Sequence, residues 1–270
     1  MHALFTHPAV QAGLLPFIVA LASAELFQRL RLSGLAIIAG FAATVYFVGD
    51  FDVAPLTETR KIIWLGIAAS VLALPITLIT WNYWRHSLTT LAAVATAWVF
   101  WDTLQQHALV DSLRWVTGSA LYVAWLVYWF DALHDRPVAA ASTGLALGVG
   151  TGMAGLLAAA ALPGRFGLAV GAAAAAHLLI QLISNNRLPC GRSFTLPLPI
   201  IAGLSGCYAV MTTQQPWYTL IALGLIPVAA RIPVPEKWAL RLQALALSLL
   251  TGACAAAAIH LTWNRGNPLF

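Results

Sequence analysis

Residues 193–230 read SFTLPLPIIAGLSGCYAVMTTQQPWYTLIALGLIPVAA and contain no charged side chain. Two apolar runs make up this stretch, and only the short polar segment TTQQP at 212–216 separates them. A helix needs about 20 mainly apolar residues to cross the hydrocarbon core of a bilayer. The stretch therefore predicts two membrane-spanning helices joined by a tight turn, the second of them short.

The rest of the chain has the same character. Of its 270 residues, 60% are apolar and 9% are charged, and the mean hydropathy is +0.82. A typical soluble domain has about 25% charged residues, so this chain has too few polar side chains to cover a water-exposed surface. We predict an all-α, polytopic integral membrane helix bundle of about ten transmembrane helices with short loops. Residues 1–270 would form a single transmembrane domain, with no soluble domain.

The predicted helices end mainly at charged residues, because single Arg, Lys and Asp residues separate the apolar runs. On this basis we predict helices over 9–28, 32–49, 61–84, 87–108, 113–131, 138–162, 166–186, 194–212, 216–231 and 238–263. Ten crossings would place both ends of the chain on the same side of the membrane.

The distribution of basic residues predicts the orientation. With ten crossings, nine of the 14 Lys and Arg residues fall on one side. They are Arg29, Arg31, Arg85, Arg136, Arg187, Arg192, Arg231, Lys237 and Arg241. Since Lys and Arg are enriched in cytoplasmic loops, we expect a bacterial inner-membrane protein with both termini in the periplasm. These residues are scattered singly and form no patch, so the net charge of +5 does not indicate nucleic-acid binding.

Cysteine and histidine spacing predicts neither a metal site nor a bound cofactor. Cys190, Cys207 and Cys254 form no CxxC pair, and the last two lie within apolar runs. Buried thiols that act as small apolar residues are the simplest interpretation. Haem bound by two histidines would need both at matching depth, but only His177 lies near the middle of a predicted helix. The sequence also lacks a Gly-rich phosphate loop, a nucleophile elbow and an HExxH box.

Polar groups inside a membrane are costly, so they are the first candidates for function. His177 lies near the centre of the helix predicted over 166–186, and Gln181 and Asn185 follow it at helical spacing. One interpretation is a substrate or proton path along this polar stripe. The other is a neutral imidazole bonded to a neighbouring helix, with the two amides as interhelical hydrogen-bonding groups. In both cases His177 and Gln181 should face other helices, because a neutral imidazole has a donor and an acceptor to satisfy.

Glu25 is a further candidate on the substrate path. It lies one turn inside the cytoplasmic end of the first predicted helix, and Arg29 follows four residues later. Glu followed by a basic residue at this spacing forms a local ion pair on a helix. The alternative is a carboxylate that binds a coupling ion.

Two polar clusters lie at predicted helix ends. Asp102, Gln105 and His107 are near the outer end of the fourth helix, and Asp131, His134 and Asp135 are at the cytoplasmic end of the fifth. We interpret both clusters as polar helix ends, because a zinc site takes about four ligands and neither cluster supplies them.

Segment 138–176 is rich in Gly and Ala. Small residues allow helix backbones to approach closely in a membrane. The segment therefore predicts tight packing within the bundle. Contact with other membrane subunits, or a sliding surface in a transporter, is the alternative.

Three classes of function remain. The many short-looped spans, segment 138–176 and the Pro-interrupted helices favour a small-molecule permease or exporter with no catalytic centre of its own. The scarcity of buried charge also fits an accessory or scaffold subunit of a larger membrane complex. A membrane enzyme acting on lipid or quinone is third, since its acid, base or metal would have to come from the two polar clusters. A water-filled cavity lined by His177 and Gln181 would favour transport, whereas a dry bundle with a broad apolar face would favour the subunit.

Overall fold

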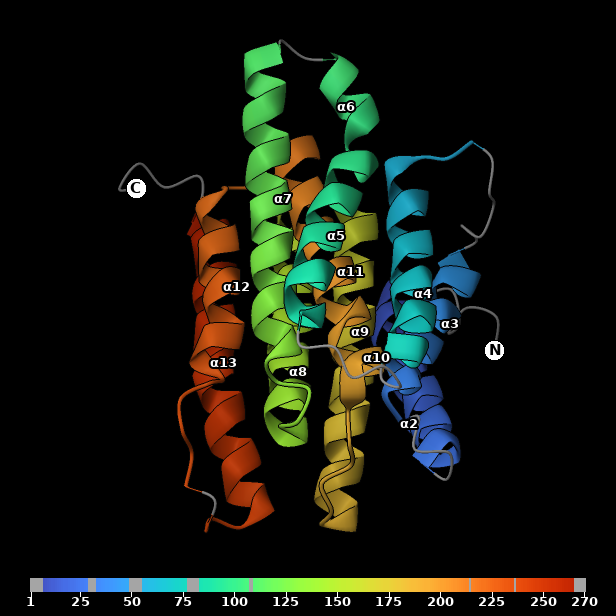
Figure 1. Ribbon diagram of the computed structural model, residues 1–270, viewed down its shortest axis with the longest axis vertical. Coiled ribbons are helices and arrows are strands. Elements are labelled where there is room, and N and C mark those ends of the chain that lie inside the picture. Colours follow the sequence, from blue (N-terminus) through green and yellow to red (C-terminus); the bar gives the residue numbers. More distant parts are fainter. Residues whose placement is uncertain are drawn as a thin grey trace.

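A computed structural model of the chain describes residues 7–28, 33–48, 55–76, 83–106, 109–213, 215–235 and 237–264. Within these ranges every regular element is a helix, and most helices run along the long axis of the molecule (Figure 1). The predicted all-α fold class is therefore confirmed.

The helices follow one another with short connections. In the first half they are η1 (Val10–Leu14), α2 (Leu15–Gln28), η2 (Ser33–Leu35), α3 (Ala36–Val48), α4 (Glu58–Ile76), α5 (Trp84–Val99), α6 (Trp101–Gln106) and α7 (Leu109–Asp131). In the second half they are α8 (Pro137–Leu157), α9 (Ala161–Ser184), α10 (Gly191–Thr195), α11 (Pro197–Thr212), α12 (Tyr218–Ala229) and α13 (Leu240–Trp263).

Within the described ranges, six helical segments are long and apolar enough to cross a membrane. They are Val10–Phe27, Glu58–Ile76, Pro137–Leu157, Ala161–Ser184, Gly191–Thr212 and Leu240–Trp263. α3 and α12 are apolar but shorter, α5 has 16 residues, and α7 has 23 but is not among the apolar six. A helix overlaps each of the ten predicted ranges, so membrane integration is supported, but a count of ten crossings stays a prediction.

The centre of the bundle is built on α8 and α9, which pack backbone against backbone. A Cβ atom added at Gly148 would lie 2.4 Å from the Cα atom of Gly171, and one added at Gly167 would lie 2.6 Å from the backbone nitrogen of Gly152. Only glycine fits such an approach. The small residues of 138–176 therefore pack against one another within the bundle, as predicted. Contact with another subunit through this segment stays a prediction.

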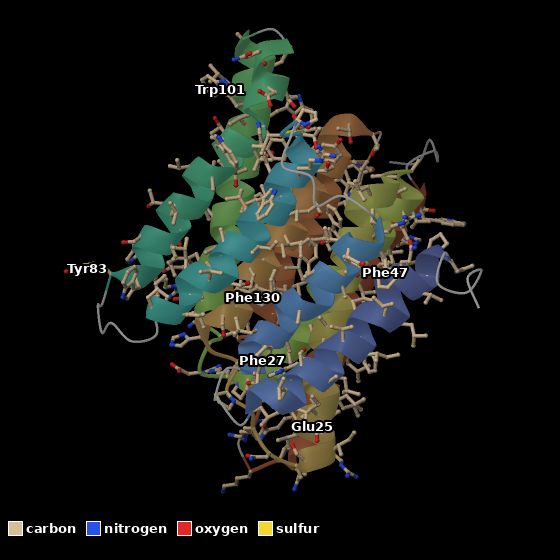
Figure 2. The ribbon with its side chains drawn as sticks, turned by 90° about the vertical axis from the view of Figure 1, so that its right-hand side faces the viewer. Glu25, Phe27, Phe47, Tyr83, Trp101 and Phe130 are labelled. Atoms are coloured by element: carbon tan, nitrogen blue, oxygen red, sulfur yellow. The ribbon has the colours of Figure 1, made fainter. Side chains whose placement is uncertain are left out.

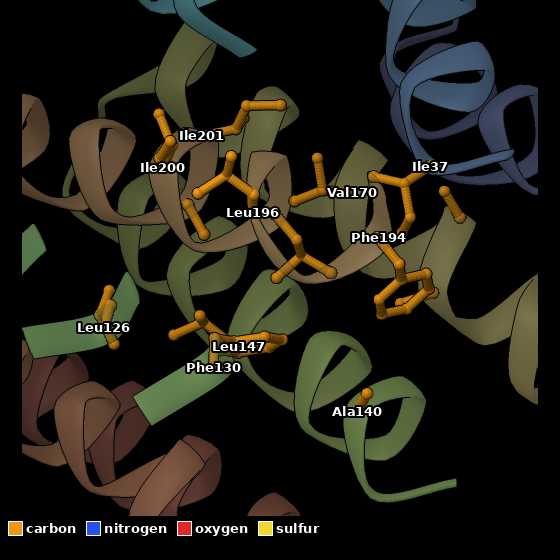
Figure 3. Packing of buried hydrophobic residues seen from close by; sticks show 14 of the residues in the cluster. Ile37, Leu126, Phe130, Ala140, Leu147, Val170, Phe194, Leu196, Ile200 and Ile201 are labelled. Carbon is orange, nitrogen blue, oxygen red and sulfur yellow. The ribbon is translucent and has the colours of Figure 1, made fainter. Parts of the chain in front are cut away.

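Large side chains fill the space around this glycine contact. The rings of Phe41 and Phe166 meet edge to face, with centroids 5.4 Å apart, and join α3 to α9. Figure 3 shows Ile37 of α3, Phe130 of α7, Leu147 of α8 and Phe194 of α10 among the buried side chains of one apolar cluster. The core thus connects the α2–α4 side of the bundle with the α7 side through α8–α11.

The outer surface carries many large apolar side chains. Trp101, Tyr83 and Phe47 are all exposed, and Figure 2 shows them at separate places on the surface. In a soluble protein such exposed apolar area marks a binding surface. In this protein the exposed apolar side chains are spread around a bundle of apolar helices, where they are suited to contact with the acyl chains of a bilayer.

Candidate functional site

His177 and Gln181 lie on successive turns of α9, and both are fully buried. The Sγ atom of Cys190 donates to the carbonyl oxygen of Pro137 at 3.5 Å and lies 3.3 Å from Nε2 of His177. Nε2 of Gln181 donates to the same Pro137 oxygen at 3.4 Å. We call these four residues the polar junction. It joins the start of α8, the end of α9 and the loop that follows α9.

The polar junction is enclosed and apolar around its edges. The ring of Phe194 packs on the imidazole of His177 with centroids 5.0 Å apart. Among the described residues, Nδ1 of His177 has no hydrogen-bond partner of normal geometry, although the backbone of Leu188 lies near the ring. The four junction residues include no acid, so nothing in the junction itself offsets the cost of a buried imidazolium, and the neutral ring is favoured. The expectation that His177 and Gln181 face inward is thus confirmed.

His177 lies nearer to one end of its helix than the sequence suggested. α9 begins at Ala161, five residues before the predicted start at 166, so its midpoint moves away from His177. The imidazole lies about two turns from the end of α9 at Ser184. Its contacts are with a loop and with α10, where the sequence had suggested the middle of the membrane.

Cys190 is the junction residue whose role the sequence did not reveal, because its thiol was expected to behave as a small apolar group. Two contacts hold its loop: Oγ of Ser33 donates to the Pro189 carbonyl at 2.8 Å, and a Cβ atom on Gly34 would lie 2.3 Å from the Cys190 carbonyl oxygen. Both contacts come from residues more than 150 positions away in the sequence. Spacing along the chain could not have shown them.

The other two candidates on the substrate path lie at the surface. Asn185 is exposed and ends α9 in the left-handed conformation, with φ of 48°. Asn adopts this conformation more readily than most residues, so its position is explained by helix termination. Glu25 is exposed at one end of the bundle, the lower end in Figure 2. Its predicted partner Arg29 lies outside the described residues.

The outer polar cluster forms an ion pair with α4. Nζ of Lys61, which is almost completely buried, lies 2.7 Å from Oδ2 of Asp102 in α6, and 5.4 Å from the ring centroid of Trp98. Gln105 is exposed, and His107 lies outside the described residues. The sequence did not pair Asp102 with Lys61, which lies at the start of another predicted helix.

The second polar cluster separates into two contacts. Asp131 is buried and its Oδ1 accepts a hydrogen bond from Nε of Arg192 at 2.9 Å. His134 instead pairs with the exposed carboxylate of Asp135, with Nε2 and Oδ2 3.0 Å apart. In the described part of the chain, no group of three or more His, Cys, Asp or Glu side chains is placed to hold a metal ion.

A cavity of about 750 Å³ opens elsewhere, between α7, α11 and α12. We call it the aromatic cavity. Its lining includes three indole rings, Trp115, Trp125 and Trp217, together with Leu and Val side chains. Asp111 and Arg114 stand at the end where α7 begins, with their charged groups 3.8 Å apart. The cavity is therefore mainly apolar, with both signs of charge at one end.

The inner part of the aromatic cavity carries a few polar groups. The hydroxyl of Ser119 contacts the thiol of Cys207, and the enclosed hydroxyl of Tyr122 has no hydrogen-bond partner among the described residues. Nε1 of Trp125 donates to the Gly224 carbonyl at 2.9 Å and fixes its indole ring in the wall. The Tyr122 ring therefore contributes to the wall, while its hydroxyl is closed off by surrounding protein atoms.

Proline interrupts two of the helices that line cavities. Pro227 lies inside α12, one turn beyond Gly224, and Pro75 lies inside α4, where a smaller apolar cavity of about 290 Å³ separates α4 from α5. Pro197 and Pro199 do not interrupt a helix. They lie in the first turn of α11, where proline is compatible with a helix.

The polar junction and the aromatic cavity are separate sites. Neither His177 nor Gln181 lines the aromatic cavity or the α4–α5 cavity. No protein-family model matches the chain, and a search of curated proteins finds no relative. The fold and the cavity define the class: an α-helical protein whose described residues include six helices apolar enough to cross a membrane, with an aromatic cavity between α7, α11 and α12.

Proposed function

We propose that the protein is a membrane permease or exporter that binds a small amphipathic molecule in the aromatic cavity. The observation that carries the proposal is the cavity itself, about 750 Å³ in volume and lined by three indole rings. Sites for small molecules typically measure about 300–1,000 Å³ and combine apolar walls with a few polar groups. The aromatic cavity has both properties.

The lining indicates the chemical class of the substrate. Flat indole faces favour a planar or aliphatic body. A charged group of either sign could bind at Asp111 or Arg114 at the end of the cavity. We therefore expect a small, mostly apolar molecule with one charged or strongly polar end.

The helices around the aromatic cavity are suited to movement. Pro227 has no backbone N–H, so the turn of α12 beside Gly224 lacks one helical hydrogen bond. Interrupted helices are common at the binding sites of transporters, because their broken turns leave backbone groups free to bind a substrate. In this proposal all ten helical ranges cross a bacterial inner membrane, and the termini face the periplasm.

A change at Gly118 tests the proposal. Gly118 lines the aromatic cavity, and a Cβ atom there would meet nothing within 4 Å. Gly118→Leu should fill the cavity without straining the fold. Gly252 of α13 has equally open surroundings and lines none of the cavities described above, so Gly252→Leu is the matched control.

The measurement is uptake of two aromatic probes, ethidium and salicylate, by membrane vesicles that contain the protein. We expect transport of at least one probe, its loss in Gly118→Leu and its retention in Gly252→Leu. Transport of both probes at wild-type rates by both variants would contradict a substrate path through the aromatic cavity.

An accessory subunit of a membrane complex is the second candidate, and one observation favours it. The hairpin formed by α6 and the first part of α7 extends beyond the rest of the bundle (Figure 1). Its Trp101, Val110 and Leu113 are exposed apolar residues. A partner subunit could cover them. Purification in mild detergent from the native membrane would then recover a second protein in a fixed ratio, lost after Trp101→Glu, and neither probe would be transported.

A further inference from the structure

Another cavity, with charged residues in its lining, lies at the opposite end of the bundle from Asp111. It has a volume of about 440 Å³ and is lined by the start of α8, the loop after α9, the connection between α12 and α13, and α13 itself. We call it the basic cavity, because the guanidinium groups of Arg136 and Arg187 line it. It lies on the side that the distribution of Lys and Arg predicts to be cytoplasmic.

Arg187 is held in place by a buried amide. Oε1 of Gln243, whose residue is 7% exposed, accepts a hydrogen bond from Nη2 of Arg187 at 3.2 Å. Nε2 of the same Gln243 donates to the carbonyl oxygens of Pro235 and Trp238 at 3.3 and 3.0 Å. Gln243 therefore connects α13 and the loop before it to Arg187. An arginine fixed in this way loses less conformational entropy when an anion binds.

Arg136 brings a second positive charge together with a helix N-terminus. Arg136 precedes Pro137, the first residue of α8, and the described residues offer its guanidinium no ion pair. Val138 and Ala139 also line the cavity, and their backbone N–H groups have no acceptor within the described ranges. Free N–H groups and the helix dipole both favour an anion here. They add to the attraction of the two guanidinium groups.

The charge balance around the cavity is positive. Asp135 is the one acid among the described lining residues, and its carboxylate is mainly exposed and paired with His134. Arg231, next to the cavity in sequence, stacks on Trp129 with 4.9 Å between the guanidinium carbon and the ring centroid. Glu236 lies outside the described residues. One exposed, paired carboxylate does not neutralise two arginines.

We propose that the basic cavity binds a phosphate group, held by Arg136, Arg187 and the first free N–H groups of α8. Guanidinium groups bind phosphate oxygens in a paired geometry. The remaining lining is apolar and includes Ile232, Pro233 and Leu247. This wall fits the glycerol and first acyl carbons of an anionic phospholipid, and basic pockets between membrane helices bind such headgroups. Free inorganic phosphate shares the same chemistry. The proposal does not depend on a substrate in the aromatic cavity.

The test measures binding to the purified protein in an uncharged detergent by native mass spectrometry. Phosphatidylglycerol is compared with phosphatidylcholine, and sodium phosphate with sodium chloride at equal ionic strength. Arg136→Ala and Arg187→Ala should each weaken phosphatidylglycerol binding about tenfold, the effect of losing one charged hydrogen-bond partner. Arg241→Ala, an exposed arginine at the same end of the bundle, is the matched control and should leave binding unchanged.

Each outcome decides the proposal. Arginine-dependent binding of phosphatidylglycerol identifies a lipid headgroup, and arginine-dependent binding of phosphate alone identifies a free anion. An equal loss in Arg241→Ala would indicate attraction to the whole basic surface and would overturn the proposal. Equal affinity for phosphatidylcholine and phosphatidylglycerol, with no effect of phosphate, would also overturn it. If the alanine variants do not fold, Arg187→Lys keeps the charge and should still lower affinity, because lysine cannot make the paired contact.

Discussion

The thiol of Cys190 lies 3.3 Å from the imidazole of His177, inside a junction that also includes the Pro137 carbonyl. His177 and Cys190 belong to different elements, one to α9 and the other to the loop before α10. Both are closed off from solvent. This contact fixes the loop against the start of α8 and gives the buried imidazole a polar neighbour. The contact between His177 and Cys190 therefore joins parts of the bundle to one another, and it lies away from the aromatic cavity.

The first prediction concerns the stability that His177 provides. His177→Ala removes the polar contact with Cys190 and the ring contact with Phe194, so the free energy of unfolding should fall by about 1–3 kcal/mol. Asn185→Ala, at the exposed end of the same stripe, should change it little. Thermal unfolding of the purified variants in detergent measures both. A His177→Ala protein that unfolds like wild type but has lost transport would show that the imidazole belongs to the substrate path instead.

The second prediction concerns thiol reactivity. Cys190 and Cys207 are buried, whereas Cys254 is partly exposed on α13. Burial also raises the pKa of the Cys190 thiol, so less of the reactive thiolate forms at neutral pH. In the folded protein, a membrane-permeant maleimide should modify Cys254 first, since it lies within the lipid-facing part of α13, and should modify all three only after denaturation in dodecyl sulfate. Mass spectrometry of labelled peptides gives the order, and early labelling of Cys190 would mean that its loop opens.

The third prediction concerns the backbone contact between α8 and α9. Gly148→Ala places a methyl group within 2.4 Å of Gly171 backbone atoms, so the helices must separate. Overpacking of this kind costs about 1–3 kcal/mol, and a rigid backbone neighbour gives little relief. At Gly252 the space is open, and Gly252→Ala should be neutral or stabilising, because alanine favours a helix. Equal unfolding temperatures for the two variants would contradict the close contact.

The fourth prediction compares two ion pairs on α7. The side chains of Asp131 and Arg192 are 7% and 18% exposed, and Asp131→Asn leaves a largely buried guanidinium without its carboxylate. The expected loss is about 3–5 kcal/mol. The pair between Asp111 and Arg114 is exposed at both ends, so Asp111→Asn should cost less than about 0.5 kcal/mol. Unfolding curves of the two variants, recorded in the same detergent, give the difference.

Composition and charge spacing were sufficient to predict the helical fold and the order of its helices. A helix overlaps every predicted range. A chain with so few polar residues is suited to a membrane, and in a membrane the backbone N–H and C=O groups must form their hydrogen bonds within helices. The lengths of the helices were less predictable. α12 ends at Ala229 after 12 residues, and α5 breaks at Phe100 within an unbroken apolar run.

The candidate sites were harder to predict, because they depend on contacts between distant segments. Burial of His177 and Gln181 followed from helical spacing, but their partner Cys190 is brought near by the turn after α9. The aromatic cavity was not predicted at all, because Trp125 and Trp217 lie far apart in the sequence and no spacing pattern links them. Only the packing of α7 against α11 and α12 places their rings around one space.

The last prediction concerns the path of the chain through the membrane. Alkaline phosphatase fused after a given residue is active only in the periplasm, where its disulfides form. If all ten ranges cross, fusions after Asp135, Asn186 and Lys237 should be inactive, and fusions after Ala159, Thr213 and Phe270 should be active. A green fluorescent protein that needs the cytoplasm for fluorescence should give the opposite pattern.

The fusions after Thr213 and Lys237 are the most informative pair, because α12 lies between these two residues and is shorter than a typical span. Equal activity at these two positions would mean that α12 enters the membrane without crossing it. A reversed pattern at every position would keep the ten crossings but place the nine basic residues outside, which would also place the basic cavity on the periplasmic side.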